Sequence, residues 1–158
     1  YADLAVAKGQ TTVLLDGYRG VDSVLATGAV DILKINCDEV RALSGLDDVA
    51  EAARWCLSTY RLGWLGLTDG AARAYLYSAD GAWRFSLPQL DTVRNPIGAG
   101  DTVSAVFLHY LLAGTDAVSA FQHGLAAACA SCGHLAGAEF TRDEMVALVE
   151  QIDVDGIA

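Results

Sequence analysis

Basic side chains are scarce in this chain. Its 158 residues include 10 Lys and Arg against 20 Asp and Glu, which gives a formal net charge of -10 at pH 7. Nucleic acids and anionic membranes attract proteins mainly through Lys and Arg. The composition therefore argues against nucleic acid or a membrane surface as a general partner. Any anion that this protein binds has to be held by a local feature rather than by the overall charge.

Cysteine and strongly apolar runs are scarce as well. The four Cys are scattered through apolar stretches, unlike those of a small secreted disulfide scaffold. We therefore expect reduced thiols and a location in the cytoplasm or another reducing compartment. The most apolar stretch, residues 118–138, is rich in Ala and contains one Gln and two His, whereas a membrane helix needs about 20 strongly apolar residues. The first ten residues also lack the basic start and apolar core of a signal peptide. We expect a protein without a membrane segment.

The remaining composition is that of a folded protein. A hydrophobic share of 53% excludes a disordered chain, and the length fits a single domain over residues 1–158. Hydrophobic spacing and turn residues predict strands at 11–16, 30–35 and 62–67 and a hairpin at 72–78 with 83–87. They predict helices at 21–27, 36–43, 47–60, 102–113, 116–132 and from 141 onward, so that strands alternate with helices along most of the chain. This alternation indicates an α/β layered domain with a mostly parallel sheet flanked by helices, plus a β-hairpin.

The stretch best suited to chemistry is Asn-Pro-Ile-Gly-Ala-Gly-Asp at residues 95–101, directly before an apolar helix. Gly98 and Gly100 allow a tight turn and a close approach to a ligand. The first N–H groups of the helix lack intrahelical partners, and together with the positive end of the helix dipole they form an anion pocket. Asp101, at the edge of that pocket, suits a base that activates an attacking hydroxyl. The alternative is an ordinary Gly-rich turn with Asp101 as the helix N-cap.

Two further segments follow predicted strands. Residues 34–39 (KINCDE) place Asn36 and Glu39 on one side of a helical turn, where they could hold Mg²⁺ through a bound water. Spacing alone favours a capping box, which needs no metal. Thr68 and Gly70 lie at the C-terminal end of a strand, where open α/β sheets bind ligands. Taken alone, they are interpreted as a turn into the hairpin.

The histidines and the paired cysteines are less informative. Cys129, Cys132 and His134 suggest a metal or redox site, but zinc needs four ligands and no second Cys pair is present. The small apolar residues around the two cysteines favour close helix packing instead. His109 and His123 lie on apolar helices and are interpreted as packed side chains rather than ligands.

Taken in order, these motifs resemble those of the PfkB/ribokinase family of sugar kinases. NPIGAGD is similar to the C-terminal signature of that family, and KINCDE is similar to its Asn-x-x-Glu motif. LTDGAARAYL resembles its Thr-x-Gly-x-x-Gly strand, and FQHGLAAACASCGHLAGAEF resembles the helix and loop that border the adenine. The resemblance covers nearly the whole chain.

The resemblance implies a ribokinase-like fold and ATP-dependent transfer of a phosphoryl group to a hydroxyl of a sugar or sugar phosphate. Asp101 would deprotonate that hydroxyl. The backbone amides of Gly98, Ala99 and Gly100, with that of Asp101, would form the anion hole.

The resemblance also implies that ATP and Mg²⁺ are bound. Asn36 and Glu39 would order Mg²⁺ through water, and Lys34 would lie near the nucleotide phosphates. The other contacts with the nucleotide would come from Thr68 and Gly70, which would face ATP, and from His123 and Ala127, which would border the base.

Two positions are similar to the branch of the family that acts on phosphorylated ketohexoses such as tagatose 6-phosphate and fructose 1-phosphate. They are Asn95, before the Gly-rich loop, and Lys34, before the Asn-x-x-Glu asparagine. Four other positions depart from the family pattern. Ile35 replaces the usual Pro, Ala72 and Ala74 occupy a stretch where the family tends to place Gly, and Val106 replaces a small residue. Asn95, in place of Asp, also weakens the case for a monovalent-cation site.

Members of the family are about twice as long, so we expect this chain to correspond to the C-terminal, nucleotide-binding half, with the N-terminal part of the fold missing. A truncated or vestigial nucleotide-binding module without kinase activity is therefore an alternative, and self-association into a homo-oligomer is left open. A Rossmann-type dinucleotide enzyme would need Gly-x-Gly-x-x-Gly after the first strand, and residues 16–20 lack that spacing.

Overall fold

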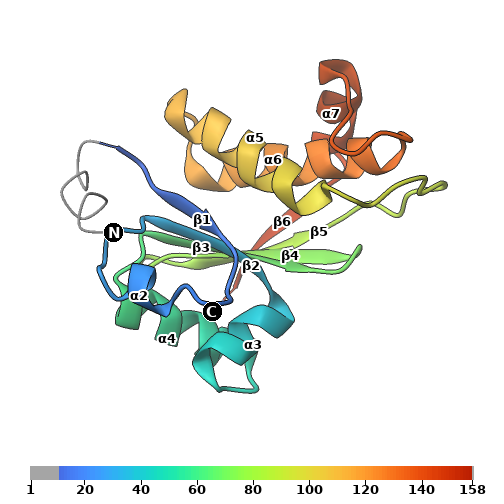
Figure 1. The fold of residues 1–158 in the computed structure, drawn as a ribbon. Helices are drawn as coiled ribbons and strands as arrows, with labels where there is room; N and C mark the ends of the chain where they lie inside the picture. Colours follow the sequence, from blue (N-terminus) through green and yellow to red (C-terminus); the bar gives the residue numbers. More distant parts are fainter. Residues whose placement is uncertain (1–10, 158) are drawn as a thin grey trace. The chain divides into compact units, whose positions relative to one another are not determined.

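The computed structural model describes residues 11–157 (Figure 1). Six strands pair side by side within this range, in the order β1-β2-β3-β4-β5-β6. The strands are β1 (Leu14–Asp16), β2 (Ile32–Asn36), β3 (Trp64–Asp69), β4 (Arg73–Tyr77), β5 (Ala82–Ser86) and β6 (Asp153–Ile157). The helices are α2 (Asp22–Leu25), α3 (Cys37–Ser44), α4 (Val49–Tyr60), α5 (Ala99–Leu112), α6 (Ala117–Cys132) and α7 (Arg142–Val149). Within the described range, every helix is too short or too polar to span a bilayer.

The sheet is mixed rather than purely parallel. β1 pairs with β2, and β2 pairs with β3, both in parallel. β4 and β5 form the expected hairpin, in which the amide of Ser78 donates to the carbonyl oxygen of Gly81 at 2.9 Å. The α/β class and the hairpin predicted from the sequence are therefore confirmed.

The described residues form two compact units. The first comprises residues 11–69, 75–82 and 156–157, and the second comprises 70–74 and 83–155. The assignment of residues 1–158 to a single domain stays a prediction.

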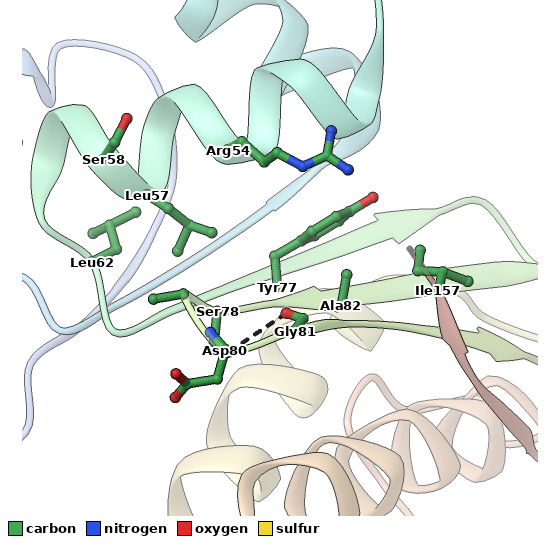
Figure 2. Close-up of a pocket in the computed structure, with 11 residues that line it drawn as sticks. Arg54, Leu57, Ser58, Leu62, Tyr77, Ser78, Asp80, Gly81, Ala82 and Ile157 are labelled. Atoms are coloured by element: carbon green, nitrogen blue, oxygen red, sulfur yellow. Dashed lines mark hydrogen bonds between the residues drawn. The ribbon is translucent and has the colours of Figure 1, made fainter.

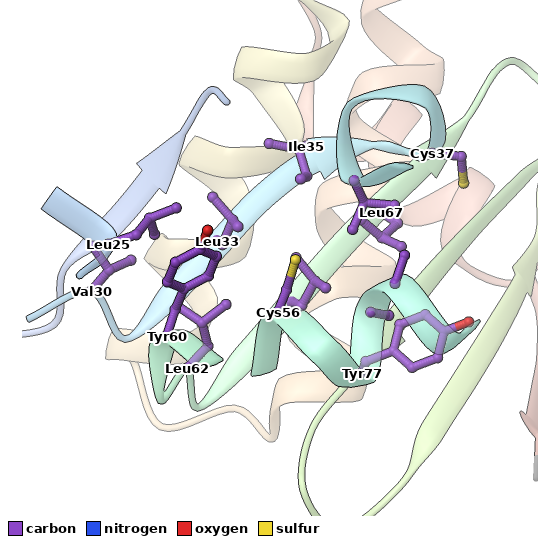
Figure 3. Packing of buried hydrophobic residues seen from close by; sticks show 14 of the residues in the cluster. Leu25, Val30, Leu33, Ile35, Cys37, Cys56, Tyr60, Leu62, Leu67 and Tyr77 are labelled. Atoms are coloured by element: carbon purple, nitrogen blue, oxygen red, sulfur yellow. The ribbon is translucent and has the colours of Figure 1, made fainter. Parts of the chain in front are cut away.

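The core of the first unit lies where β2 and β3 meet α3 and α4 (Figure 3). Leu33 and Ile35 from β2 and Leu67 from β3 are fully buried there, together with Cys56 from α4. Successive side chains of a strand point to opposite faces. The residues between these leucines and isoleucines, such as Lys34, are therefore directed to the other face of the sheet.

The second unit is built around the contact between α5 and α6, which lie side by side (Figure 1). Phe121 of α6 makes edge-to-face contacts with Phe107 of α5 and Phe85 of β5, each with ring centroids 5.2 Å apart. The two helices approach closely at Gly124, where an added Cβ would lie only 2.8 Å from the carbonyl oxygen of Val103. The mutual position of the two helices therefore depends on the missing side chain at Gly124.

The structure differs from the sequence predictions at several element ends, such as β1, which begins at Leu14 rather than at 11. Two further differences concern α5 and β6. Helix α5 begins at Ala99, three residues before the predicted start at 102, with Gly98 as its N-cap in the left-handed region at φ 85°. Strand β6, at 153–157, was not predicted, because its sequence Asp-Val-Asp-Gly-Ile contains three residues that strands disfavour. Both elements are determined by contacts that local patterns do not report.

Gly124→Ala is expected to destabilise the protein by about 1–3 kcal/mol, because the new methyl group would push α5 and α6 apart. Urea unfolding followed by circular dichroism measures this change. Gly156→Ala is the matched control, since an added Cβ there meets no atom within 4 Å, and we expect its effect to stay within about 0.5 kcal/mol. Equal stability of the Gly124 variant and the wild type would contradict the close contact.

Candidate functional site

Parallel pairing brings two of the predicted site residues together at the C-terminal ends of two neighbouring strands. Asn36 ends β2 and lies opposite Thr68 of β3 in the strand register. Asn36 is exposed and Thr68 is half-buried. Gly70 comes directly after β3. It is exposed, and its φ of 63° lies in the left-handed region. The C-terminal ends of the two strands therefore present polar side chains, as the sequence predicted.

Asn36 and Glu39 form a complete capping box at the start of α3. The side-chain oxygen of Asn36 accepts from the Glu39 amide at 2.8 Å, and Glu39 Oε2 accepts from the Asn36 amide at 2.8 Å. The capping interpretation is confirmed.

Capping leaves oxygen lone pairs on both side chains, and Mg²⁺ prefers oxygen ligands while keeping several waters. The pair therefore fits a water-mediated Mg²⁺ contact, but does not encircle an ion. Residues 11–157 contain no group of three or more His, Cys, Asp or Glu placed to hold a metal directly.

Lys34 is nearly buried, which is unusual for a lysine. Its side chain is 7% exposed, and its Nζ lies 3.4 Å from Oδ2 of Asp16. The parallel register places Lys34 directly opposite Asp16 on β1 and Gly66 on β3. Asp16, Lys34 and Gly66 thus form one cross-strand row of the sheet. The next row on the same face contains Asn36 and Thr68.

The second unit carries the glycine-rich stretch. Gly98 is the N-cap of α5 and provides no side-chain cap, so the interpretation of Asp101 as N-cap is wrong. Ala99 N–H donates to Pro96 O at 3.2 Å, and Thr102 N–H donates to Gly98 O at 2.8 Å. Gly100 and Asp101 lie between Ala99 and Thr102 in the sequence, and their amides have no acceptor among residues 11–157.

Asp101 is exposed in the first turn of α5. Its carboxylate is therefore accessible beside amides that have no partner and the positive end of the helix dipole. An anion that accepts from these amides would lie next to a group able to take up a proton. This geometry fits the predicted anion hole and base.

A second loop, at residues 133–138, supports the glycine-rich stretch. Asn95 Nδ2 donates to Leu135 O at 2.9 Å, and Asn95 Oδ1 accepts from the Ile97 amide at 3.0 Å. An added Cβ at Gly137 would lie 2.8 Å from Ile97 O. The supporting roles of Asn95 and Gly137 were not predicted, because they join segments about 40 residues apart.

His123 and Ala127 occupy α6. His123 Nδ1 lies 2.8 Å from the carbonyl oxygen of Ser119, and because that oxygen only accepts, Nδ1 carries the proton. The imidazole stacks on Tyr110 with centroids 4.2 Å apart. Ala127 is fully buried. Their contact with a nucleotide base stays a prediction.

Cys129, Cys132 and His134 pack or form hydrogen bonds within the fold. Cys129 and Cys132 are unoxidised thiols, and burial raises the pKa of Cys129 to about 11. His134 Nε2 lies 3.0 Å from Oε1 of Glu144, which also closes the predicted capping box of α7 with Thr141. The amide and the hydroxyl of Thr141, followed by His134, hold the pKa of Glu144 below its ordinary value.

A pocket of about 510 Å³ lies in the first unit between α4 and the hairpin turn (Figure 2). Arg54 and Leu57 from α4, with Tyr77 and Asp80 from the hairpin, contribute to its walls. It contains none of the predicted site residues. Leu62, which also lines it, precedes β3, whereas Asn36 and Thr68 lie beside the other end of that strand.

Comparison with known proteins identifies the family. The family model of the pfkB carbohydrate kinases matches residues 5–143. The chain belongs to this family. Pyridoxal kinase PdxY of Histophilus somni is 31% identical to this pfkB-family chain in an alignment of 123 residues, and the match covers 70% of this chain and 43% of that protein. The pyridoxal kinase PdxY of Aliivibrio fischeri is 32% identical in an alignment of 116 residues, and the match covers 65% of this chain and 40% of that protein.

Similarity to solved structures establishes the ribokinase-like fold. The ribokinase of Thermotoga maritima superposes with a TM-score of 0.81 at 22% identity, over 94% of this chain and 52% of that chain. The ribokinase of Arabidopsis thaliana, complexed with ribose and ATP, has a TM-score of 0.77 at 21% identity, over 89% and 48% of the two chains. The chain thus spans about half the length of the relatives that it matches. The predicted ketohexose-phosphate branch stays a prediction.

The capping carboxylate of Glu144 predicts a pH dependence. Its pKa is lower in the folded state than in the unfolded chain, so its contribution to stability is present above the unfolded pKa and lost as the pH falls through the folded one. Glu144→Gln is expected to be less stable than the wild type at pH 7, with a smaller difference at pH 3. Urea unfolding at both pH values tests this. Glu150→Gln, at the C-cap of the same helix and outside the capping box, serves as control, and an unchanged Glu144 difference at pH 3 would contradict the assignment.

Proposed function

We propose that this chain is the nucleotide-binding and phosphoryl-transferring part of an ATP-dependent kinase that phosphorylates a hydroxyl group. The observation that carries the proposal is the start of α5. There the exposed carboxylate of Asp101 lies beside the amides of Gly100 and Asp101, which have no acceptor among the described residues. Membership of the pfkB carbohydrate kinase family supports the same reaction.

In the proposed reaction the acceptor hydroxyl gives its proton to the carboxylate of Asp101. The resulting oxygen nucleophile forms a bond to the γ-phosphorus of ATP while the bond between that phosphorus and the bridging oxygen breaks, and ADP leaves. The amides of Gly98, Gly100 and Asp101 would donate to the phosphoryl oxygens as their charge redistributes. The Ala99 amide, which the sequence also assigned to the anion hole, donates to the carbonyl oxygen of Pro96 at 3.2 Å instead. Such a transfer depends mainly on positioning and on electrostatic stabilisation, which a rigid helix start supplies.

The remaining contacts with the nucleotide are proposed from the sequence motifs. Asn36 and Glu39 fit a water-mediated contact with Mg²⁺, which would neutralise part of the phosphate charge. Lys34 would contribute a positive charge toward the phosphates. The exposed turn after β3, with Thr68 and Gly70, would approach the nucleotide. The same motifs assign His123 and Ala127 to the border of the base.

The acceptor is proposed from chemistry and family alone. A sugar or a sugar phosphate, including a ketohexose phosphate, fits the pfkB carbohydrate kinases. Pyridoxal joins the candidates because curated relatives are pyridoxal kinases. Each of these compounds offers a hydroxyl whose proton Asp101 could take.

Asp101→Asn is expected to lower the turnover number by a factor of about 100 to 10,000, since the amide cannot accept the proton. The affinity for ATP should stay the same or increase, because the variant removes a negative charge next to the phosphates. Coupled ADP release measures turnover, and calorimetry measures binding.

Asp80→Asn is the matched control for this experiment. It makes the same chemical change in an exposed hairpin turn that tolerates Asn-Gly as well as Asp-Gly. Its turnover should equal that of the wild type. Full turnover by the Asp101 variant would contradict the assignment of the base.

A second candidate function is a nucleotide-binding module without catalysis. It is favoured by one observation, namely that the chain spans only about half of its relatives. The 158-residue chain can be tested with ATP and ADP by calorimetry and with a panel of a ketohexose phosphate, a free sugar and pyridoxal by ADP release. Binding with turnover supports the kinase, and binding without turnover supports the module. Absence of nucleotide binding would contradict both functions.

A further inference from the structure

We propose that Asp16, at the end of β1, is a positioning residue for the proposed phosphate site, because it holds the Lys34 ammonium group where a nucleotide phosphate can reach it. The inference rests on the proposed function and assigns a role to a residue that none of the sequence motifs contains. It starts from the parallel register, in which Asp16 and Lys34 occupy directly opposite positions on neighbouring strands.

The exposure of the Asp16 and Lys34 side chains shows which charge needs the other as a partner. The Lys34 side chain is 7% exposed and the Asp16 side chain is 33% exposed. A nearly buried ammonium group is costly unless a negative charge compensates it, whereas a carboxylate at the surface stays hydrated. Asp16 therefore supplies the negative charge that compensates the nearly buried ammonium group of Lys34.

The ion pair leaves the ammonium group able to bind a second anion. The distance from Lys34 Nζ to Asp16 Oδ2 is 3.4 Å, longer than the roughly 2.7–2.9 Å of a strong charge-assisted hydrogen bond. An ammonium group has three donors, and a carboxylate at this distance does not use all of them. A phosphate oxygen could therefore bind Lys34 without displacing Asp16.

The neighbouring rows of the sheet give the direction in which a phosphate would bind. Lys34 and Asn36 share one face of β2, and their positions are about 6.6 Å apart along the strand. The flexible lysine stem can span that distance. On β3 the residue opposite Lys34 is Gly66, which has no side chain to obstruct the ammonium group. Lys34 thus lies within reach of the row that contains Asn36 and Thr68.

The test is a set of variants whose affinities for ADP and adenosine are compared. Asp16→Asn keeps the size of the side chain but removes its charge, so Lys34 loses its partner. We expect the affinity for ADP to fall by about tenfold, within the range measured for coupled neighbouring residues. The affinity for adenosine, which has no phosphates, should not change. A purely structural role for Asp16 would not distinguish these two ligands.

Lys34→Met and the double variant complete the cycle. Lys34→Met should weaken ADP binding and leave adenosine binding unchanged, and Asp16→Asn should add little further loss in its presence. If Asp16→Asn does not fold, the Lys34→Met variant still measures the charge that Asp16 is proposed to hold, and equal ADP affinity to wild type would overturn the inference. Asp80→Asn controls for the change in net charge and should bind ADP like the wild type.

The outcomes separate this inference from the proposed function. A wild-type chain that binds neither ADP nor adenosine would contradict the proposed function itself. A wild-type chain that binds ADP, with a folded Asp16→Asn variant of the same ADP affinity, would overturn only the role of Asp16. Equal losses of ADP and adenosine binding would also overturn it, since they would show a general structural effect.

Discussion

The parallel register of β1, β2 and β3 is the constraint on which the first unit's part of the candidate site depends. Because side chains alternate along a strand, Leu33 enters the core while Asp16, Lys34 and Asn36 share the opposite face, with Thr68 beside them on β3. A shift of one residue would move the ammonium group into the apolar core. The packing that stabilises this unit therefore also fixes the order of its polar groups.

In the second unit the corresponding constraint is the presence of glycine at three positions, where backbone segments approach each other closely or turn tightly. Gly124 allows α6 to approach α5, Gly98 begins α5 with a left-handed turn, and Gly137 allows the supporting loop to approach Ile97. These glycines are distant in the sequence, but each determines how closely one backbone segment approaches another. The position of Asp101 depends on all three contacts, because each of them orients α5 or the loop before it.

The sequence predicted most of the fold, because helical spacing, capping boxes and the Asp-Gly turn act locally. It did not predict the start of α5 at Ala99, since a glycine N-cap is recognised only by its backbone conformation. Residues 153–157 were missed because pairing in the sheet outweighs their poor strand propensity. At the candidate site, Asn36 and Glu39 were identified by spacing, whereas the contact between Lys34 and Asp16 depends on a strand register that no local pattern reports.

The contacts of Asn95 have a consequence for the chemical ageing of the protein. Its amide nitrogen donates to Leu135 O and its amide oxygen accepts from Ile97 N–H, so deamidation to a carboxylate would replace the donor with an acceptor and set two oxygens against each other. Deamidation normally begins when the next backbone nitrogen attacks the side-chain carbonyl and loses its proton. The next residue is Pro96, whose ring nitrogen has no proton to lose. The residue that joins the two loops is thereby protected from this reaction by its own neighbour.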